Sequence, residues 1–426
     1  MPLPALARAL RLNIMTDFAF TPVTLGPLTL RNRFIKTATY EGMVHDNAPN
    51  ELLARHHERL AEGGVGMTTL AYCAVSPEGR TFEQQMYMRE AIVPGLGRIC
   101  DRVHAHGAAV ALQLGHCGYF TKNDALGHRP KGPSKGWNAY GLMKGLGRVE
   151  PMSAADMERT AGEFAAAARL AEQAGFDAVE LHLGHGYLLS QFLSPGTNHR
   201  GDGYGGSVEG RMRFPLEVVR RVLDAVGGRI AVIAKTNLRD GFEGGLEVDD
   251  AVAVARALER EGVDAIEMSG GFVDKNPLYL LRGDRPLRDM IDVEPNRLQK
   301  VALRVFGSRL IKAQPFEPLF FLEDALRVRA AVKTPLILLG GVISRAGVAR
   351  AMDAGFECVA LGRALLYDPR FVRKLERGEE APSGCNHCNV CITEMDRPGG
   401  VCCADQPAQL DERARAVAKG LHEQLA

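Results

Sequence analysis

The sequence predicts an α/β fold, a (β/α)8 TIM barrel, because short apolar runs alternate along the chain with longer amphipathic ones. Eight of the apolar runs have the length and composition of buried parallel strands. Eight such rounds fit a closed barrel better than an open doubly wound sheet, and a chain of 426 residues is long enough for one. The predicted strands are residues 34–38, 66–71, 108–114, 178–183, 230–235, 265–269, 336–340 and 358–361.

The clearest intervening helix is predicted over residues 153–174. Ser153 is placed to cap its start, and Asp156 falls at the capping-box position. The alanine-rich interior favours a helix, and Gly175 then ends it.

Two segments exceed a minimal barrel. Residues 115–152, rich in Gly, Lys and aromatic residues, are predicted to be a long loop after the third strand, and residues 270–322 separate the sixth strand from the seventh. Loops that follow strands lie on the catalytic face of this fold, so both insertions are expected to overhang the active site. We therefore expect a barrel over residues 18–380, including the second insertion, and a cysteine-containing tail over residues 381–426.

The second insertion has a pattern of its own. Apolar residues recur at helical spacing with basic residues between them, and an aromatic stretch follows at residues 315–322. It has three interpretations: a satellite core or subunit interface, a lid that lengthens the pocket for a bulky apolar substrate, or a basic helix that touches a membrane. The apolar set is Leu298, Val301, Ala302, Val305 and Phe306, and the basic set is Arg297, Lys300, Arg304 and Arg309.

The composition excludes several classes of protein. Apolar residues make up 46% of the chain and charged residues 24%, as in ordinary globular proteins. The formal net charge of +1 gives no reason to expect a nucleic-acid partner. No uncharged apolar run approaches the roughly 18 residues of a transmembrane segment, and residues 1–15 lack the compact hydrophobic stretch of a signal peptide. We expect a cytoplasmic protein.

The run from His182 to Leu189 opens the loop after the fourth predicted strand. It places two imidazoles, His182 and His185, and the phenol of Tyr187 at the catalytic rim of the barrel. Imidazole N–H groups can bind and polarise one substrate oxygen, and a nearby phenol can give a proton to carbon. The alternative is two hydrogen-bonded rim histidines and a tyrosine that only packs.

A second run follows directly. It reads Ser194-Pro195, Asn198, Arg200, Asp202, Tyr204-Gly205-Gly206-Ser207, Arg211 and Arg213-Phe214. This fingerprint closely resembles that of the Old Yellow Enzyme family of FMN oxidoreductases, over residues 20 to about 405. The pattern departs at Gly210, where the family has Asn. The resemblance implies a TIM barrel that binds FMN and is reduced by NAD(P)H.

The resemblance also implies flavin-binding positions. The strip Thr37-Ala38-Thr39 resembles the backbone that contacts the flavin ring, and Gln113 resembles the glutamine that binds the pyrimidine. Tyr72 falls where many relatives have a small residue. Lys235 stands where the family usually has an arginine, so the positive charge is kept while the two-pronged guanidinium is lost.

Two glycine-containing turns follow the seventh and eighth predicted strands. They carry Gly340-Gly341 and Gly362-Arg363, where this fold often binds phosphate. Alone, such glycines are ordinary strand-to-helix turns. The resemblance implies that they bind the FMN phosphate, with Arg363 adding charge.

Nine cysteines are present, and four of them are scattered: Cys73, Cys100, Cys117 and Cys358. The others form C-x2-C-x2-C with a distant pair, which is the spacing of metal ligands and suits an iron–sulfur cluster or zinc; the remaining alternative is that they hold no metal. This tail resembles the iron–sulfur branch of the family, which includes trimethylamine dehydrogenase and 2,4-dienoyl-CoA reductase. The resemblance implies a [4Fe-4S] cluster on Cys385, Cys388, Cys391 and Cys403, with Cys402 as the alternative fourth ligand.

Members of that branch usually continue into a region that binds a second nucleotide. No G-x-G-x-x-G follows a predicted strand here. We therefore expect electrons to reach FMN directly from NAD(P)H, or through the cluster from an electron-transfer protein.

Three functions stay open. The first is an ene-reductase, in which FMN gives hydride from N5 to an activated alkene, His182 and His185 hold the carbonyl oxygen, and Tyr187 donates the proton. The second is an amine-type dehydrogenase that passes electrons to an external acceptor, although His182 favours oxygen over ammonium as the bound group. The third is a non-catalytic barrel. We expect a small-molecule substrate and a homo-oligomer.

Overall fold

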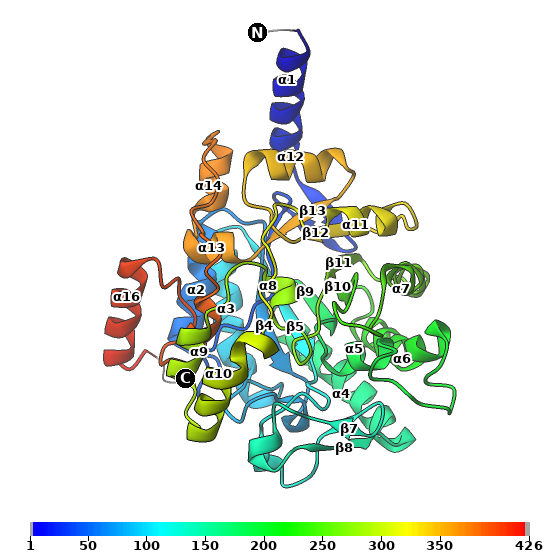
Figure 1. Cartoon of the computed structure of the whole chain (residues 1–426). Helices are drawn as coiled ribbons and strands as arrows, with labels where there is room; N and C mark the ends of the chain where they lie inside the picture. The colour runs from blue at the N-terminus through cyan, green and yellow to red at the C-terminus, as the bar shows by residue number, and fades with distance from the viewer. Residues whose placement is uncertain (1–2, 422–426) are drawn as a thin grey trace.

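Eight parallel strands close into a barrel at the centre of this computed structural model (Figure 1). The structure describes residues 3–421, with side chains from residue 11 onward. Strands pair in chain order, and β13 pairs with β3 to close the ring. All eight predicted strands are confirmed: β3 (Phe34–Lys36), β4 (Met67–Ala74), β5 (Ala109–Gly115), β9 (Ala178–Leu183), β10 (Ala231–Asn237), β11 (Ala265–Ser269), β12 (Leu336–Leu339) and β13 (Cys358–Leu361).

Helices surround the barrel and cover the outer face of the strands (Figure 1). Because the strands are buried on both faces, β12 and β13 are continuous apolar runs rather than alternating ones. The main helices are α2 (Glu51–Glu62), α3 (Val93–His104), α4 (Ala154–Gln173), α6 (Val208–Val226), α7 (Val248–Glu261), α11 (Leu322–Arg329), α12 (Arg345–Asp353) and α14 (Phe371–Glu376). None of the described helices is both long and apolar enough to cross a bilayer.

Helix α4 begins with the predicted capping box. The Ser153 hydroxyl accepts from the Asp156 backbone N–H at 3.1 Å, and the Asp156 carboxylate accepts from the Ser153 backbone N–H at 2.9 Å. Gly175, at φ +92°, follows the end of the helix. The prediction of this helix is confirmed at both ends.

The segment 115–152 is not the simple loop that the sequence predicted. It forms a three-stranded sheet in the order β6 (Lys131–Gly132), β8 (Arg148–Pro151) and β7 (Gly136–Trp137). The prediction missed these strands because two to four residues are too few to show a period. The sheet lies at one end of the molecule in Figure 1.

The second insertion contains α8 (Leu278–Leu281), α9 (Leu287–Val293) and α10 (Arg297–Leu310), so the predicted helix is confirmed. The apolar side of α10 is turned to solvent within the described chain: Leu298, Val301, Val305, Phe306 and Leu310 are each more than half exposed. These side chains form no satellite core of their own. Helix α9 contacts α15 (Cys391–Glu394) of the tail.

The helix α1 (Leu3–Phe18) was not predicted. It packs against α12 and extends from one end of the barrel (Figure 1). Arg345 of α12 donates to the Asn13 side chain at 3.3 Å. A short hairpin of β1 (Val23–Leu25) and β2 (Leu28–Leu30) follows it. The division of the chain at residue 380 stays a prediction.

Candidate active site

His182, His185 and Tyr187 lie together at the carboxyl end of β9. The ring of His182 is 4.7 Å from the ring of Tyr187 and 5.0 Å from the ring of His185. His182 pairs in register with Lys235 on β10. The predicted trio is therefore brought together on the catalytic face.

A sharp turn after β9 aims these side chains. His185 and Gly186 both have positive φ, +62° and +81°. The Asn237 side chain accepts from the His185 backbone N–H at 3.1 Å, and the Ser190 hydroxyl accepts from the Gly186 N–H at 3.1 Å. Tyr187 then stands directly before α5 (Leu188–Leu193), which is wholly buried. The turn is thus held at both ends.

Burial sets the protonation of the trio. Burial lowers the pKa of His185 to about 3, with a further contribution from Lys235, and it lowers the pKa of His182 well below its usual value. Both imidazoles are neutral at neutral pH. Burial raises the pKa of Tyr187, so the phenol keeps its proton.

One polar atom of this trio has no partner. His182 Nδ1 is buried and makes no hydrogen bond within the described chain, whereas His185 Nε2 lies 2.7 Å from the Ser269 hydroxyl. A buried nitrogen without a hydrogen-bond partner is costly, and a bound ligand is one way to supply that partner. The site therefore fits an oxygen-bearing ligand beside His182 and Tyr187.

A buried network forms the floor of the site. Lys235 Nζ donates to the Thr37 hydroxyl at 2.6 Å and lies 2.7 Å from a Glu267 carboxylate oxygen. Gln113 donates to Glu180 at 2.5 Å, and Lys235 lies 3.9 Å from the same carboxylate. One ammonium thus faces two carboxylates.

Glu180 and Glu267 were not predicted from the sequence. Burial raises the pKa of Glu180 to about 8; of its charged neighbours, Lys235 lowers it and Glu267 raises it. The available signal was a lone carboxylate inside each of two apolar strand runs, Ala178–Leu183 and Ala265–Ser269. Such a charge is seldom buried unless it is paired.

Beside this floor lies a cavity with about 660 Å³ of empty space, part of which is open to solvent. Glycines at the ends of β12 and β13 leave room for it: Gly340 and Gly341 have φ of +108° and +75°. Its lining includes these predicted flavin-binding residues: Thr37, Ala38, Thr39, Lys235, Gly340, Gly341, Gly362 and Arg363. The residues present therefore fit FMN.

Two predicted flavin-binding residues lie elsewhere. Gln113 reaches the floor through Glu180. The Tyr72 hydroxyl donates to the Gly79 carbonyl at 2.9 Å, and its ring lies 5.1 Å from the ring of Tyr187. Tyr72 is therefore placed beside Tyr187, and it is not among the residues that line the cavity near the glycine turns.

Arg363 joins the cavity to the cysteine tail. Its guanidinium donates to the Asn389 side chain at 2.5 Å and to the Arg282 carbonyl at 2.9 Å. His387, two residues before Asn389, stacks on Phe316 of the second insertion at 3.4 Å and lines the same cavity. The second insertion and the tail therefore close the cavity together.

The tail gathers four of its five thiols. Burial and the neighbouring thiols Cys385, Cys388 and Cys403 raise the pKa of Cys391 to about 12. Cys402 turns away, and its sulfur donates to the Glu394 carboxylate at 3.9 Å. The cysteine ligand set that the resemblance implied stays a prediction.

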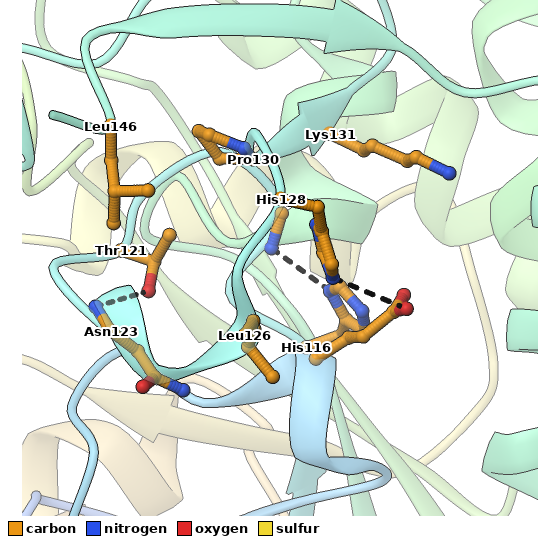
Figure 2. A pocket seen from close by; sticks show the side chains of 10 residues that line it. His116, Thr121, Asn123, Leu126, His128, Pro130, Lys131 and Leu146 are labelled. Carbon is orange, nitrogen blue, oxygen red and sulfur yellow. Dashed lines mark hydrogen bonds and ion pairs between the residues drawn. The ribbon is translucent and has the colours of Figure 1, made fainter.

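A smaller hollow of about 320 Å³ lies within the segment 115–152 (Figure 2). Its imidazoles are already bonded: His116 Nδ1 accepts from the Gly118 N–H at 3.0 Å, and His128 Nε2 lies 3.4 Å from Glu78. We assign no function to it.

Glu41, His56 and His57 bring three metal-type ligand atoms within 4.8 Å of one another. Lys36 Nζ lies 2.7 Å from the Glu41 carboxylate, so an ammonium already supplies the positive charge. Burial by itself raises the pKa of Glu41. The charge of Lys36 and the hydrogen bond with His57 together outweigh burial and lower this pKa to about 2. We assign no metal to this group.

The fingerprint after β9 is structural. Arg200 donates to the carbonyls of Pro133 and Met152 at 2.9 and 2.8 Å, which fastens the first insertion to the loop after β9. Arg211 donates to the Leu193 carbonyl at 2.7 Å. Both arginines bind backbone carbonyls, and neither is among the residues that line the cavity.

A protein-family model described as the NADH:flavin oxidoreductase / NADH oxidase family matches residues 19–274, more than half of the chain. The chain belongs to this family. As a member, it is an FMN-dependent oxidoreductase that uses NAD(P)H, and the expected likeness to Old Yellow Enzyme is confirmed.

Relatives within and near the family differ in length. The chain is 42% identical over 380 residues to 4,4'-dithiodibutanoate disulfide reductase of Rhodococcus erythropolis, covering 88% of this chain and 93% of that one. It is 29% identical over 388 residues to an NADH oxidase of Thermoanaerobacter brockii, covering 89% of this chain and about half, 54%, of the relative. A structure of 2-naphthoyl-CoA reductase with 2-naphthoyl-CoA shares the fold, with a TM-score of 0.77 at 21% identity over 94% of this chain and 58% of that chain.

Proposed function

We propose that this protein reduces an activated C=C bond, of an enone or enoyl-type substrate, with electrons from NAD(P)H. The net reaction adds a hydride and a proton across the double bond and oxidises NAD(P)H to NAD(P)⁺. The observation that carries the proposal is the unpartnered His182 nitrogen, 4.7 Å ring to ring from a protonated Tyr187.

The two histidines and the tyrosine have different roles in the proposed reaction. His182 and His185 bind the substrate carbonyl oxygen as neutral donors, so negative charge can develop there. Tyr187 holds the proton that is delivered to the α-carbon. When bound, FMN supplies the hydride, and the residues that would hold it are those that line the 660 Å³ cavity, with Gln113 at the pyrimidine.

Replacing Tyr187 with Phe tests this role. Tyr187→Phe removes the proton donor and keeps the ring, so enone reduction is expected to slow by about 10²- to 10⁴-fold. Flavin reduction by NAD(P)H, followed separately by stopped flow, is expected to change little. Tyr204→Phe, which removes a surface phenol that donates to Glu217 at 3.1 Å, is the control. Equal losses in both half-reactions contradict the proposed role.

Disulfide reduction is a second candidate. The observation that favours it is the 42% identity to a disulfide reductase over nearly the whole of both chains. Here the hydride would break the S–S bond, giving one thiol and one thiolate, and Tyr187 would protonate the thiolate; one NAD(P)H and one proton give two thiols. Burial raises the pKa of Cys117, near Tyr187, to about 12, so this thiol is not a nucleophile for exchange. Comparing kcat/KM for 4,4'-dithiodibutanoate and a simple enone decides between the two.

We also propose a [4Fe-4S] cluster on Cys385, Cys388, Cys391 and Cys403. No three of the described thiols lie within 4.8 Å of one another. A single tetrahedral zinc, with bonds of about 2.3 Å, needs sulfurs nearer than that, so the wider spacing favours a cluster over zinc. Electron transfer with another protein, a homo-oligomeric state and a cytoplasmic location belong to the same proposal.

The non-catalytic alternative disagrees with the family membership of the chain. A yellow protein that NAD(P)H reduces is the direct check.

A further inference from the structure

Aromatic side chains form a continuous row that leads outward from His182. Tyr187 contacts Phe120 at a ring distance of 6.0 Å, and Phe120 stacks on Tyr140 at 4.6 Å. Tyr140 contacts Phe82 at 6.2 Å. We call Tyr187, Phe120, Tyr140 and Phe82 the aromatic row.

The aromatic row is assembled from three separate loops. Phe82 follows β4, Phe120 and Tyr140 belong to the segment after β5, and Tyr187 follows β9. All three loops follow barrel strands, so they meet on the catalytic face. The row therefore extends from the reacting groups across this face.

The ammonium of Lys122 lies over the outer end of the aromatic row. Lys122 Nζ is 4.9 Å from the ring centre of Phe82 and 5.1 Å from that of Tyr140, both within cation–π range. No carboxylate in the described part of the chain lies within 4.0 Å of this nitrogen. Asp396 of the tail feels its charge from farther away. The ammonium is held in place by rings without being neutralised.

We propose that Lys122 recognises an anion on the acceptor, and that the acceptor carries a carboxylate joined by a short apolar chain to the bond that is reduced. This inference rests on the proposed function. The apolar chain lies along Phe120 and Tyr140, the carboxylate meets Lys122, and the reducible bond lies at His182 and Tyr187.

The same geometry disfavours an amine substrate. Cations bind over aromatic faces, but here Lys122 already occupies the faces of Phe82 and Tyr140. A second cation on this row meets a like charge. The amine-type dehydrogenase therefore fits the site less well than a reductase of anionic acceptors.

The test compares an acid with its neutral ester on the FMN-loaded enzyme. The substrates are 6-oxohept-4-enoate and its methyl ester, and 4,4'-dithiodibutanoate and its dimethyl ester. The Lys122→Met variant keeps the apolar stem and removes the charge. The KM for each acid is expected to rise about 10- to 100-fold, because one charge-assisted contact is lost, while kcat changes little. The KM for each ester is expected to stay unchanged in Lys122→Met. The Lys122→Arg variant is expected to restore the wild-type KM for the acids.

Two further variants bracket the effect. Lys144→Met changes a lysine of the same segment that pairs with Asp124 at 3.0 Å, and it is expected to behave as wild type. Asp396→Asn removes the nearby negative charge and is expected to lower the KM for the acids. Acid and ester affected alike in Lys122→Met would overturn the proposal, because that pattern means a structural role.

A binding measurement separates this inference from the proposed function. The saturated product, 6-oxoheptanoate, and its methyl ester are titrated into oxidised enzyme, and the shift of the flavin spectrum reports the Kd. Weaker binding of the acid alone in Lys122→Met supports the proposal even if no acceptor is turned over. If instead flavin reduction by NAD(P)H is what Lys122→Met impairs, Lys122 binds the dinucleotide phosphates and the proposal fails.

Discussion

Lys235 meets two buried carboxylates, and this changes how its charge acts on the flavin site. From the sequence, Lys235 is expected to keep the positive charge that the family's arginine provides at this position. In the structure Glu267 lies 2.7 Å from its ammonium and offsets that charge. The trio His182, His185 and Tyr187 could be predicted because its motif is local, whereas the floor depends on which strands become neighbours.

Glu180 gives the first prediction at the residue scale. Burial raises the pKa of Glu180 to about 8, against an ordinary value of 4.5. Between these values the folded protein keeps a proton that the unfolded chain has lost, so stability falls as pH rises through this window, by at most about 1.4 kcal/mol per pH unit. The groups that face this carboxyl are Lys235, Glu267 and Gln113.

Glutamine at position 180 mimics the protonated form and cannot ionise. Glu180→Gln is expected to match wild type in urea unfolding at pH 5 and to exceed it in stability at pH 8. Glu217→Gln, which changes a carboxylate bound to Tyr204 near the surface, serves as the control. An offset between variant and wild type that is the same at both pH values argues against a raised pKa at Glu180.

At the scale of elements, the fingerprint after β9 identifies the family, although its residues take no part in the proposed reaction. Arg200 and Arg211 bind backbone carbonyls, so they specify a loop conformation. The departure at Gly210 has a local cause: a Cβ there would lie 2.2 Å from the Gly205 carbonyl oxygen. Sequence alone shows the departure but not the close backbone approach that requires it.

Gly210 and Gly162 make a matched pair of helical glycines. A Cβ at Gly162 in α4 would meet nothing within 4 Å. Gly210→Ala is therefore expected to destabilise the fold by about 1–3 kcal/mol, and Gly162→Ala to stabilise it by up to about 1 kcal/mol. Urea unfolding of both variants checks the opposite signs. A stable Gly210→Ala protein would show that the loop after β9 can move aside.

For the whole molecule, the barrel and the tail share one cavity. The eight strands were predictable because a strand that is buried on both faces is made mostly of apolar residues. The closure of the cavity by Phe316, His387 and Arg363 was not, since these residues are far apart in the chain and meet only after folding. The same holds for the sheet in the segment 115–152.

The tail gives a prediction for the intact protein. After anaerobic purification, we expect a flavin spectrum together with iron and sulfide. Cys403→Ser is expected to lose most of the iron, because Cys403 faces Cys385 and Cys388. Cys402→Ser is expected to keep it, because Cys402 faces Glu394. Loss of iron from both variants, or zinc in place of iron, contradicts the assigned ligand set.

The segment 115–152 supplies Phe120, Lys122 and Tyr140, yet it adds no strand to the barrel. Arg200, which lies outside this segment, donates hydrogen bonds to the carbonyls of Pro133 and Met152 within it. Lys122, proposed to bind the acceptor, and His182 and Tyr187, proposed to act in the reaction, thus lie on different stretches of the chain. Grafting this one stretch from a relative should exchange the range of compounds reduced while the chain still folds around the same flavin.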